Sequence, residues 1–225
     1  MDPLILAGHI MPEKNAKILD IGTGCGIIPM LLSARYPHLD ILGIEIQKEL
    51  YDCACKNIQN HGCRNVQLFH KNVADLRISD IGDAVTHIVS NPPYRKKTSS
   101  RISPDPQKAI ACHDIHLDLP LFFTCAGNLL KDHGSLYLIF PADRLSDLLV
   151  SMAAHRFSAC RIRFIHPRKT TPARRVVVHA LKKKAAHCTI LPPLFVLNSR
   201  NTPTREYLSM VTPWFARQKP DHAAV

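Results

Sequence analysis

Apolar and polar residues follow two different periodicities along the chain. Short runs of apolar, often β-branched residues predict buried strands, and we expect them over residues 17–21, 40–46, 66–70, 84–90, 135–140, 157–166 and 174–181. Apolar residues at helical spacing predict helices over residues 2–11, 26–35, 47–61, 115–130 and 143–154. This alternation of strand and helix is typical of βαβ units and a parallel sheet.

The fold class predicted from this order is α/β, with a mostly parallel seven-stranded sheet and helices on both faces. The last two predicted strands have no helix between them, so we expect one of them to run antiparallel. A length of 225 residues fits one such domain better than two. We expect that domain over residues 1–184 and a partly irregular tail over residues 185–225.

The composition limits the expected binding partners and the cellular compartment of the protein. The net charge of +11 favours polyanionic partners, nucleic acid first and an anionic membrane surface second. The eight cysteines match no zinc-binding spacing, which predicts free thiols in a reducing compartment. We find no signal peptide and no apolar stretch of about 18 residues or more, so we expect a cytoplasmic protein without a membrane span.

A glycine-rich turn follows the first predicted strand, in the order Asp20-Ile-Gly22-Thr-Gly24-Cys-Gly26. Glycines allow tight turning and let backbone N–H groups approach a ligand without a Cβ atom in the way. The spacing G-x-G-x-G differs from the dinucleotide pattern G-x-G-x-x-G. The acid at the strand end suits a cationic ligand, such as a methionine moiety with its ammonium and sulfonium groups, better than a pyrophosphate.

Two further acids follow the next strands. Glu45 ends the second predicted strand about 20 residues after the glycines, where a carboxylate can accept hydrogen bonds from two ribose hydroxyls. Asp75 follows the third strand, where an acid can accept a hydrogen bond from an adenine amino group. Asp80 and Asp83 lie nearby and compete for that second role.

The fourth predicted strand ends in Asn91-Pro92-Pro93-Tyr94. Prolines remove N–H donors, so this turn presents carbonyl oxygens, and Asn91 adds a side-chain acceptor. Tyr94 offers a flat ring for stacking. Acceptors beside a stacking ring predict a pocket for a planar group bearing NH2. They hold the amine hydrogens and stabilise the positive charge that grows on the nitrogen during transfer.

With these motifs the sequence resembles the Rossmann-like class I amino-methyltransferases that use S-adenosylmethionine and carry an (N/D)PP(Y/F) motif. More narrowly, residues 2–181 resemble the bacterial enzymes that methylate N6 of adenine 37 in a valine tRNA. The resemblance implies that Asp75 holds the adenine of the cofactor and that Asn91 also adjoins the cofactor. It implies that Asn91 and the Pro92 carbonyl hold the amine, and that Tyr94 stacks on the target base. The methionine and ribose parts of the cofactor are expected to be held by Asp20, Gly22, Gly24, Gly26 and Glu45.

The family carries an N-terminal segment with strands ahead of the helix that begins at Asp2. The sequence holds no counterpart of that segment, so we expect the chain to be shortened at its N-terminus relative to the family.

Basic residues follow the Pro-Pro turn and recur near the last strands. The first set is predicted to bind phosphates beside a flipped-out nucleotide and consists of Arg95, Lys96, Lys97 and Arg101. A second set extends that track and consists of Arg161, Arg163, Arg168, Lys169, Arg174 and Arg175. The run Lys182 to Lys184 is interpreted as a solvated surface. His113 and His116 lack an evident third ligand, so no metal is predicted.

The function that we expect is methyl transfer from S-adenosylmethionine to N6 of an adenine in RNA, with tRNA as the first candidate. The same Asn-Pro-Pro-Tyr chemistry also serves protein glutamine-N5 methyltransferases, which carry an N-terminal helical domain. Ribosomal guanine-N2 methyltransferases usually have Phe after the prolines. An RNA-binding module without chemistry is the non-enzymatic alternative.

Overall fold

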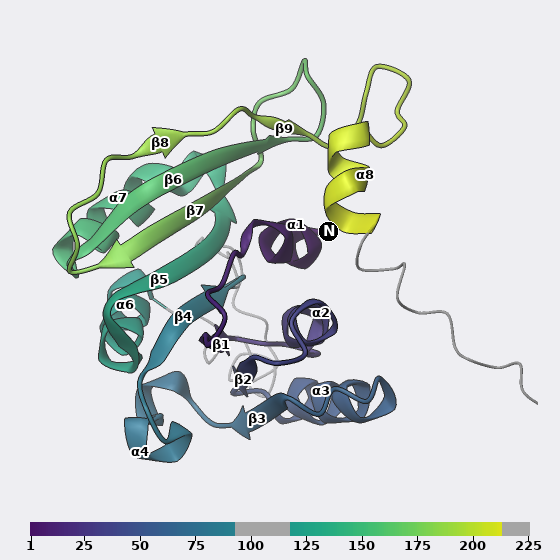
Figure 1. Cartoon of the computed structure of the whole chain (residues 1–225). Helices are drawn as coiled ribbons and strands as arrows, with labels where there is room; N and C mark the ends of the chain where they lie inside the picture. The colour runs from purple at the N-terminus through teal and green to yellow at the C-terminus, as the bar shows by residue number, and fades with distance from the viewer. Residues whose placement is uncertain (93–117, 213–225) are drawn as a thin grey trace, which may run out of the picture.

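The computed structural model describes residues 1–92 and 118–212, and a mixed nine-stranded sheet runs through this part of the chain (Figure 1). The long strands are β1 (Lys17–Ile21), β2 (Asp40–Glu45), β3 (Val66–His70), β4 (Val85–Ser90), β5 (Leu130–Pro141), β6 (Phe157–His166) and β7 (Arg175–Lys182). Two short strands, β8 (Thr189–Ile190) and β9 (Leu194–Phe195), follow. The order across the sheet is β3-β2-β1-β4-β5-β7-β6-β8, and β9 also pairs with β6.

The direction of the strands confirms the predicted fold class. Strands β3, β2, β1, β4 and β5 pair in parallel, whereas β7 is antiparallel to both β5 and β6. The seven predicted strands are β1 to β7, and β8 and β9 are additions that the sequence pattern did not predict. Strand β5 begins at Leu130 rather than at residue 135, because Leu130 already pairs with Val85.

Helices cover both faces of the sheet (Figure 1). One face carries α1 (Asp2–His9), α2 (Ile27–Arg35) and α3 (Lys48–Asn60), and the other carries α4 (Ile78–Ile81), α6 (Leu119–Leu129) and α7 (Leu145–Ala154). Short 3-10 helices η1 (Val73–Asp75) and η2 (Ala142–Arg144) follow β3 and β5. Of the helix predicted over residues 115–130, residues 115–117 lie outside the described residues.

Two buried apolar clusters hold these layers together, one on each side of the sheet. Successive strand residues point to opposite faces, so Ile18 packs with α1 and α2 while Leu19 packs with α6 and α7. A central parallel strand is therefore apolar on both sides, which explains its nearly continuous hydrophobic run. Asp20 interrupts the run in β1 although it is fully buried.

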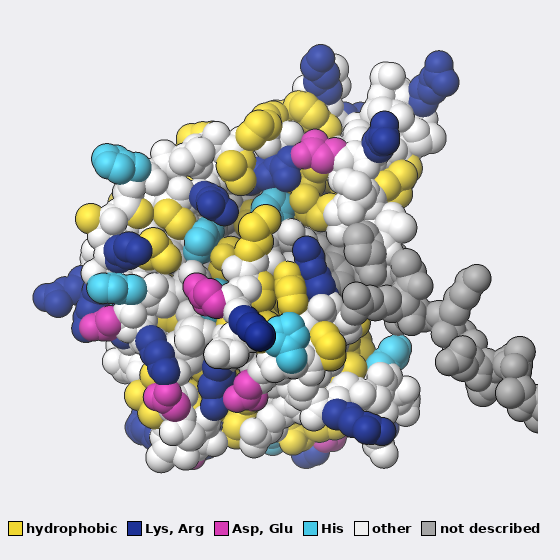
Figure 2. Space-filling model, in the orientation of Figure 1, with side chains coloured by type: hydrophobic (Ala, Val, Ile, Leu, Met, Phe, Trp, Pro, Cys, Tyr) yellow, Lys and Arg dark blue, Asp and Glu magenta, His cyan; other side chains and the backbone are white. Residues whose placement is uncertain are grey.

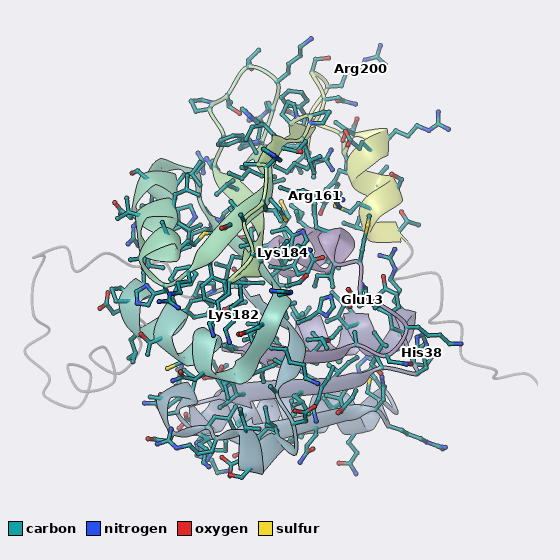
Figure 3. The ribbon with its side chains drawn as sticks, turned by 60° about the vertical axis from the view of Figure 1, so that its left-hand side comes forward. Glu13, His38, Arg161, Lys182, Lys184 and Arg200 are labelled. Carbon is teal, nitrogen blue, oxygen red and sulfur yellow. The ribbon has the colours of Figure 1, made fainter. Side chains whose placement is uncertain are left out.

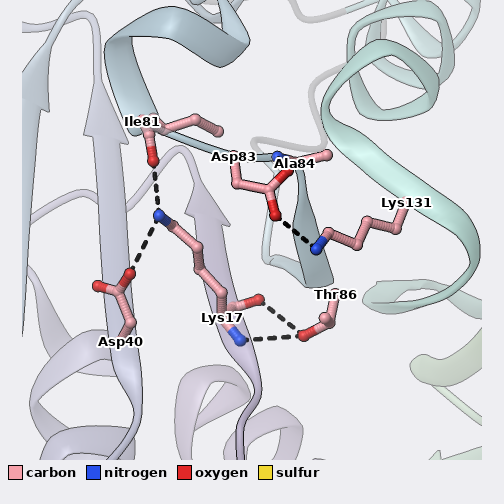
Figure 4. A network of polar contacts seen from close by, with 7 residues as sticks. All are labelled: Lys17, Asp40, Ile81, Asp83, Ala84, Thr86 and Lys131. Atoms are coloured by element: carbon pink, nitrogen blue, oxygen red, sulfur yellow. Dashed lines mark hydrogen bonds and ion pairs between the residues drawn. The ribbon is translucent and has the colours of Figure 1, made fainter.

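The amino edge of the sheet is fastened by a polar network (Figure 4). Lys17 Nζ donates to the Ile81 carbonyl at 2.5 Å and lies 3.1 Å from an Asp40 carboxylate oxygen. The Thr86 hydroxyl accepts from Lys17 N at 3.0 Å and donates to Lys17 O at 3.1 Å. Lys131 pairs with Asp83 at 2.6 Å. The polar side chains of this network thus have partners within the fold.

The described part of the tail packs against the body of the protein. Helix α8 (Arg205–Val211) lies against α1, where Val211 and Ala7 share a small apolar cluster, and β9 extends the sheet beside β6. Across residues 1–92 and 118–212, no helix is long and apolar enough to cross a membrane.

Candidate active site at the carboxyl edge of the sheet

The sheet reverses its winding between β1 and β4. From β1 the chain winds outward through β2 and β3, then returns to β4 on the other side of β1 and continues to β5. The carboxyl ends of strands on either side of such a switch point form the crevice where open α/β sheets bind ligands. Asp20 near the end of β1, Glu45 at the end of β2 and Asn91 just after β4 all lie at this edge.

The glycine turn after β1 has the backbone that its sequence predicts. Gly22, Gly24 and Gly26 have φ angles of 74°, 58° and 81°, values that strongly favour glycine. A Cβ atom at Gly22 or Gly24 would meet no atom within 4 Å, so space is open beside both residues. At Gly26 a Cβ would come within 3.2 Å of Ala54 Cβ, so this glycine also lets α3 pack closely against the turn.

Asp20 is the most unusual residue at this edge. Its side chain is fully buried, and neither carboxylate oxygen has a hydrogen-bond partner among the described residues. The pKa of Asp20 is raised to about 7, mainly by burial and in smaller part by the nearby negative charge of Glu45. The Thr23 hydroxyl lies close enough to lower that pKa by more than Glu45 raises it, but it does not reach hydrogen-bond geometry and is itself buried without a partner.

An unpartnered buried carboxylate is costly unless a ligand completes its interactions. A cationic, hydrogen-bond-donating group such as an ammonium would supply both the charge and the donors that Asp20 lacks. Thr23 offers one further polar contact beside it. The sequence motif pointed to Asp20 but not to Thr23, because a threonine between two glycines carries no distinctive signal.

Glu45 is nearly buried and already holds three backbone N–H groups. Its Oε2 accepts from Gly24 N at 2.8 Å, and its Oε1 accepts from Ile46 N and Gln47 N, both at 2.9 Å. The carboxylate thereby ties the glycine turn to the end of β2. A carboxylate has about four acceptor positions, so one remains on Oε2 for a ligand hydroxyl.

The three acidic residues after β3 differ in whether their side chains have partners. Asp80 pairs with Lys71 at 2.8 Å, and Asp83 pairs with Lys131, so both have cationic partners. Asp75, at the end of η1, is exposed and its side chain makes no hydrogen bond or ion pair with any described residue. The geometry therefore favours Asp75 over its two competitors as an acceptor for a ligand.

Asn91 is half-buried and Pro92 is buried directly after β4. The strand end is held by Ser90, whose hydroxyl donates to the Ile21 carbonyl at 2.7 Å. This bond fixes the start of the Asn-Pro turn against the last residue of β1, next to Asp20. The remaining predicted substrate residues lie outside the described residues: Tyr94, Arg95, Lys96, Lys97 and Arg101.

The second basic set divides into paired and unpaired residues. Arg163 forms an ion pair with Glu206, and Arg175 pairs with Asp2 at 2.7 Å. Both arginines hold the tail and α1 to the sheet rather than presenting free charge. Within residues 1–92 and 118–212, no group of three or more His, Cys, Asp or Glu side chains is placed to hold a metal ion, and His113 and His116 lie outside these ranges.

The order of the strands, with its switch point between β1 and β4, is that of a Rossmann-like class I methyltransferase fold. A predicted O-methyltransferase from Agrobacterium tumefaciens superposes with a TM-score of 0.76 at 20% identity, covering 95% of this chain and 96% of that chain. TrmN from Thermus thermophilus matches with a TM-score of 0.54 at 16% identity, over 75% of this chain and 44% of that one. These likenesses establish the fold.

The family follows from the sequence comparison. Residues 3–149 match the model of the methyltransferase small domain, and the chain belongs to that family. A tRNA1(Val) (adenine(37)-N6)-methyltransferase from Porphyromonas gingivalis is 35% identical over 147 residues, which are 64% of this chain and 57% of that protein. A relative of the same name from Phocaeicola vulgatus is 27% identical over 95% of this chain and 88% of its own length.

Proposed function

We propose that the protein transfers the methyl group of S-adenosylmethionine to N6 of an adenine in RNA, with tRNA as the first candidate. The observation that carries this proposal is the buried, unpartnered Asp20 carboxylate beside the strand end that presents Asn91. Relatives that share the family are named as tRNA adenine-N6 methyltransferases, and the first of them matches over 57% of its length.

The residues at the carboxyl edge fit S-adenosylmethionine. Asp20 would hold the ammonium group, the free position on Glu45 would accept from a ribose hydroxyl, and Asp75 would accept from the adenine amino group. Gly22 and Gly24 leave open space for the methionine part. The cofactor would supply a sulfonium-activated methyl group, so the protein needs no metal to activate the donor.

The chain's own contribution to the transfer is positioning and charge stabilisation. An aromatic amine is a weak nucleophile because its lone pair is delocalised into the ring. Asn91 and the Pro92 carbonyl would accept hydrogen bonds from the amine and stabilise the positive charge that develops on nitrogen. Holding the amine in line with the methyl group supplies much of the remaining rate enhancement, and the amine proton then leaves to water.

The deciding experiment uses tritiated S-adenosylmethionine and total tRNA from a strain that lacks N6-methyladenosine. The tRNA is digested after the reaction and the labelled nucleoside is identified. Label in N6-methyladenosine is the expected result. Label in another nucleoside, or in release-factor protein offered in parallel, would refute the adenine assignment. Because both substrates of this reaction are cytoplasmic, we also place the protein in the cytoplasm.

A further inference from the structure

Two loops stand next to each other at the carboxyl edge of the sheet (Figure 1). The first is the β6–β7 turn, residues 167–174, and the second is the connection before α8, residues 198–204. Strand β6 runs in the same direction as β5, because both are antiparallel to β7. The turn that follows β6 therefore projects from the same edge that presents Asn91. We call these two segments together the double loop.

Hydrogen bonds join the two segments into one unit. Arg168 Nε donates to Asn201 Oδ1 at 2.8 Å, and Leu197 N, directly before the second segment, donates to the Pro167 carbonyl at 2.9 Å. Inside the first segment the Thr171 hydroxyl bonds both the N–H and the carbonyl of Arg168, each at 3.0 Å. These hydrogen bonds hold the double loop in one conformation, so its basic residues are placed on a fixed backbone.

The double loop carries only positive charge. Its basic residues are Arg168, Lys169, Arg174 and Arg200, all exposed, and neither segment contains an acid. Figure 2 shows dark-blue side chains at the tips along the upper edge of the molecule, where these loops project. Two acids on neighbouring elements are engaged with other cations, since Glu206 pairs with Arg163 and Asp2 pairs with Arg175.

Three of these cations have no partner in the described part of the chain. The side chains of Lys169, Arg174 and Arg200 make no ion pair and no hydrogen bond with residues 1–92 or 118–212. At the opposite edge of the sheet, in contrast, Lys182 and Lys183 both pair with Asp132. Unpaired cations beside one another on a fixed backbone are what a phosphate chain requires.

We propose that the double loop binds the phosphate backbone of the RNA substrate while the target nucleotide occupies the crevice beside Asn91. The proposal rests on the function proposed above, because it takes RNA as the substrate. A protein partner is disfavoured, since none of the large exposed hydrophobic residues of the described chain falls in either segment. RNA backbone contacts position the substrate and supply affinity, whereas the crevice reads the base.

The test compares two triple variants of the whole chain. The first, Lys169→Gln/Arg174→Gln/Arg200→Gln, removes the unpaired charge of the double loop. The matched control, Lys14→Gln/Arg64→Gln/Lys184→Gln, removes the same charge from exposed residues that precede β1 and β3 or follow β7, and thus lie toward the amino edge. Figure 3 shows Arg200 at one tip of the molecule and Lys184 well away from it.

Binding of an unmodified tRNA transcript is measured by fluorescence anisotropy at several salt concentrations. We expect the double-loop variant to bind at least about tenfold more weakly, with a slope of log K against log salt reduced by about two to three. The control should stay within about threefold of the wild type. Cofactor affinity by calorimetry and Tm should be unchanged in both variants, and KM for RNA should rise in the double-loop variant while kcat is retained.

Equal weakening in both variants, or unchanged RNA affinity in the double-loop variant, would overturn the proposal, since either result shows that these positions have no special role. Loss of kcat at saturating RNA without loss of affinity would overturn it as well. If RNA affinity falls in the double-loop variant alone but the labelled product is not N6-methyladenosine, the RNA surface stands and the adenine assignment fails.

Discussion

Replacing Asp20 by asparagine should stabilise the cofactor-free protein while it weakens cofactor binding. The native carboxylate is fully buried and unpartnered, and its pKa is raised to about 7 from an ordinary value of 3.8. In the unfolded chain the group ionises freely. At neutral pH the fold therefore bears the free-energy cost of a buried charge, and Asp20→Asn removes that charge with almost no change in shape.

The size of the effect follows from the linkage between pKa and stability. A difference of about three pKa units corresponds to about 4 kcal/mol at a pH above both values. Below about pH 4 both states are protonated and the cost vanishes. Between the two pKa values the folded state holds a proton that the unfolded state has lost, so stability declines as pH rises. The cost grows by about 2 kcal/mol between about pH 5.5 and about pH 8.

The assay is urea unfolding of both proteins without cofactor at these two pH values. We expect the stability gained by Asp20→Asn to be about 2 kcal/mol larger at the higher pH. Other titrating groups are common to both proteins and cancel in the difference. Asp143→Asn, at an exposed acid, serves as the control and should change stability by less than about 0.5 kcal/mol.

If the stability difference between the wild type and Asp20→Asn did not change with pH, the account of Asp20 would be refuted. The amide of the variant does not titrate, so the expected change with pH must come from the Asp20 carboxyl group. If Asp20→Asn gained more stability at the lower pH, the expected direction of the pH dependence would be wrong. Cofactor affinity provides a separate readout: Asp20→Asn should weaken it, while Asp143→Asn should not.

Three further variants test the rest of the site. Asn91→Ala should lower the rate of methyl transfer by about a hundredfold or more while cofactor affinity by calorimetry is largely kept, and full activity would contradict the proposed amine pocket. Glu45→Ala should weaken cofactor binding by about 1–3 kcal/mol and also lower Tm, because three backbone N–H groups lose their acceptor. Gly26→Ala should cost more unfolding free energy than Gly62→Ala, since both glycines have positive φ but only Gly26 would direct its Cβ against Ala54; equal costs would show that this contact is unimportant.

The central strands could be predicted because buried strands appear in the sequence as short runs of apolar residues. Strand β1 has its predicted bounds, and its run of buried residues ends at Gly22. The edge strand β3 also has its predicted bounds, although its side chains are only partly buried or exposed. The start of β5 was not predictable, because Lys131, Asp132 and His133 are exposed and carry no strand pattern. The two-residue strands β8 and β9 exist through pairing with β6, which no local pattern reports.

The candidate site was predictable in position but not in its electrostatics. The glycine motif located Asp20 and Glu45, yet only the structure shows that Glu45 is largely engaged by backbone N–H groups whereas Asp20 has none. Charge counting failed for Arg163 and Arg175, because their partners Glu206 and Asp2 are distant in sequence. Long-range pairing is decided by the fold, so counting cations along the sequence overestimates a basic surface.

Among the described residues, two of the buried polar side chains without a hydrogen-bond partner, Asp20 and Thr23, lie together at the carboxyl edge of the sheet, whereas the others, His9 and Ser151, lie on helices α1 and α7. At the amino edge Lys17 and Thr86 bond backbone and side-chain partners within the fold. At the carboxyl edge Asp20 and Thr23 are buried without partners, at a cost that an apolar residue of similar shape would avoid. A fold selected for stability alone would not retain that cost at one edge while removing it at the other. We therefore expect a charged ligand at this edge to contribute to the stability of the protein, and cofactor binding should raise Tm more in the wild type than in Asp20→Asn.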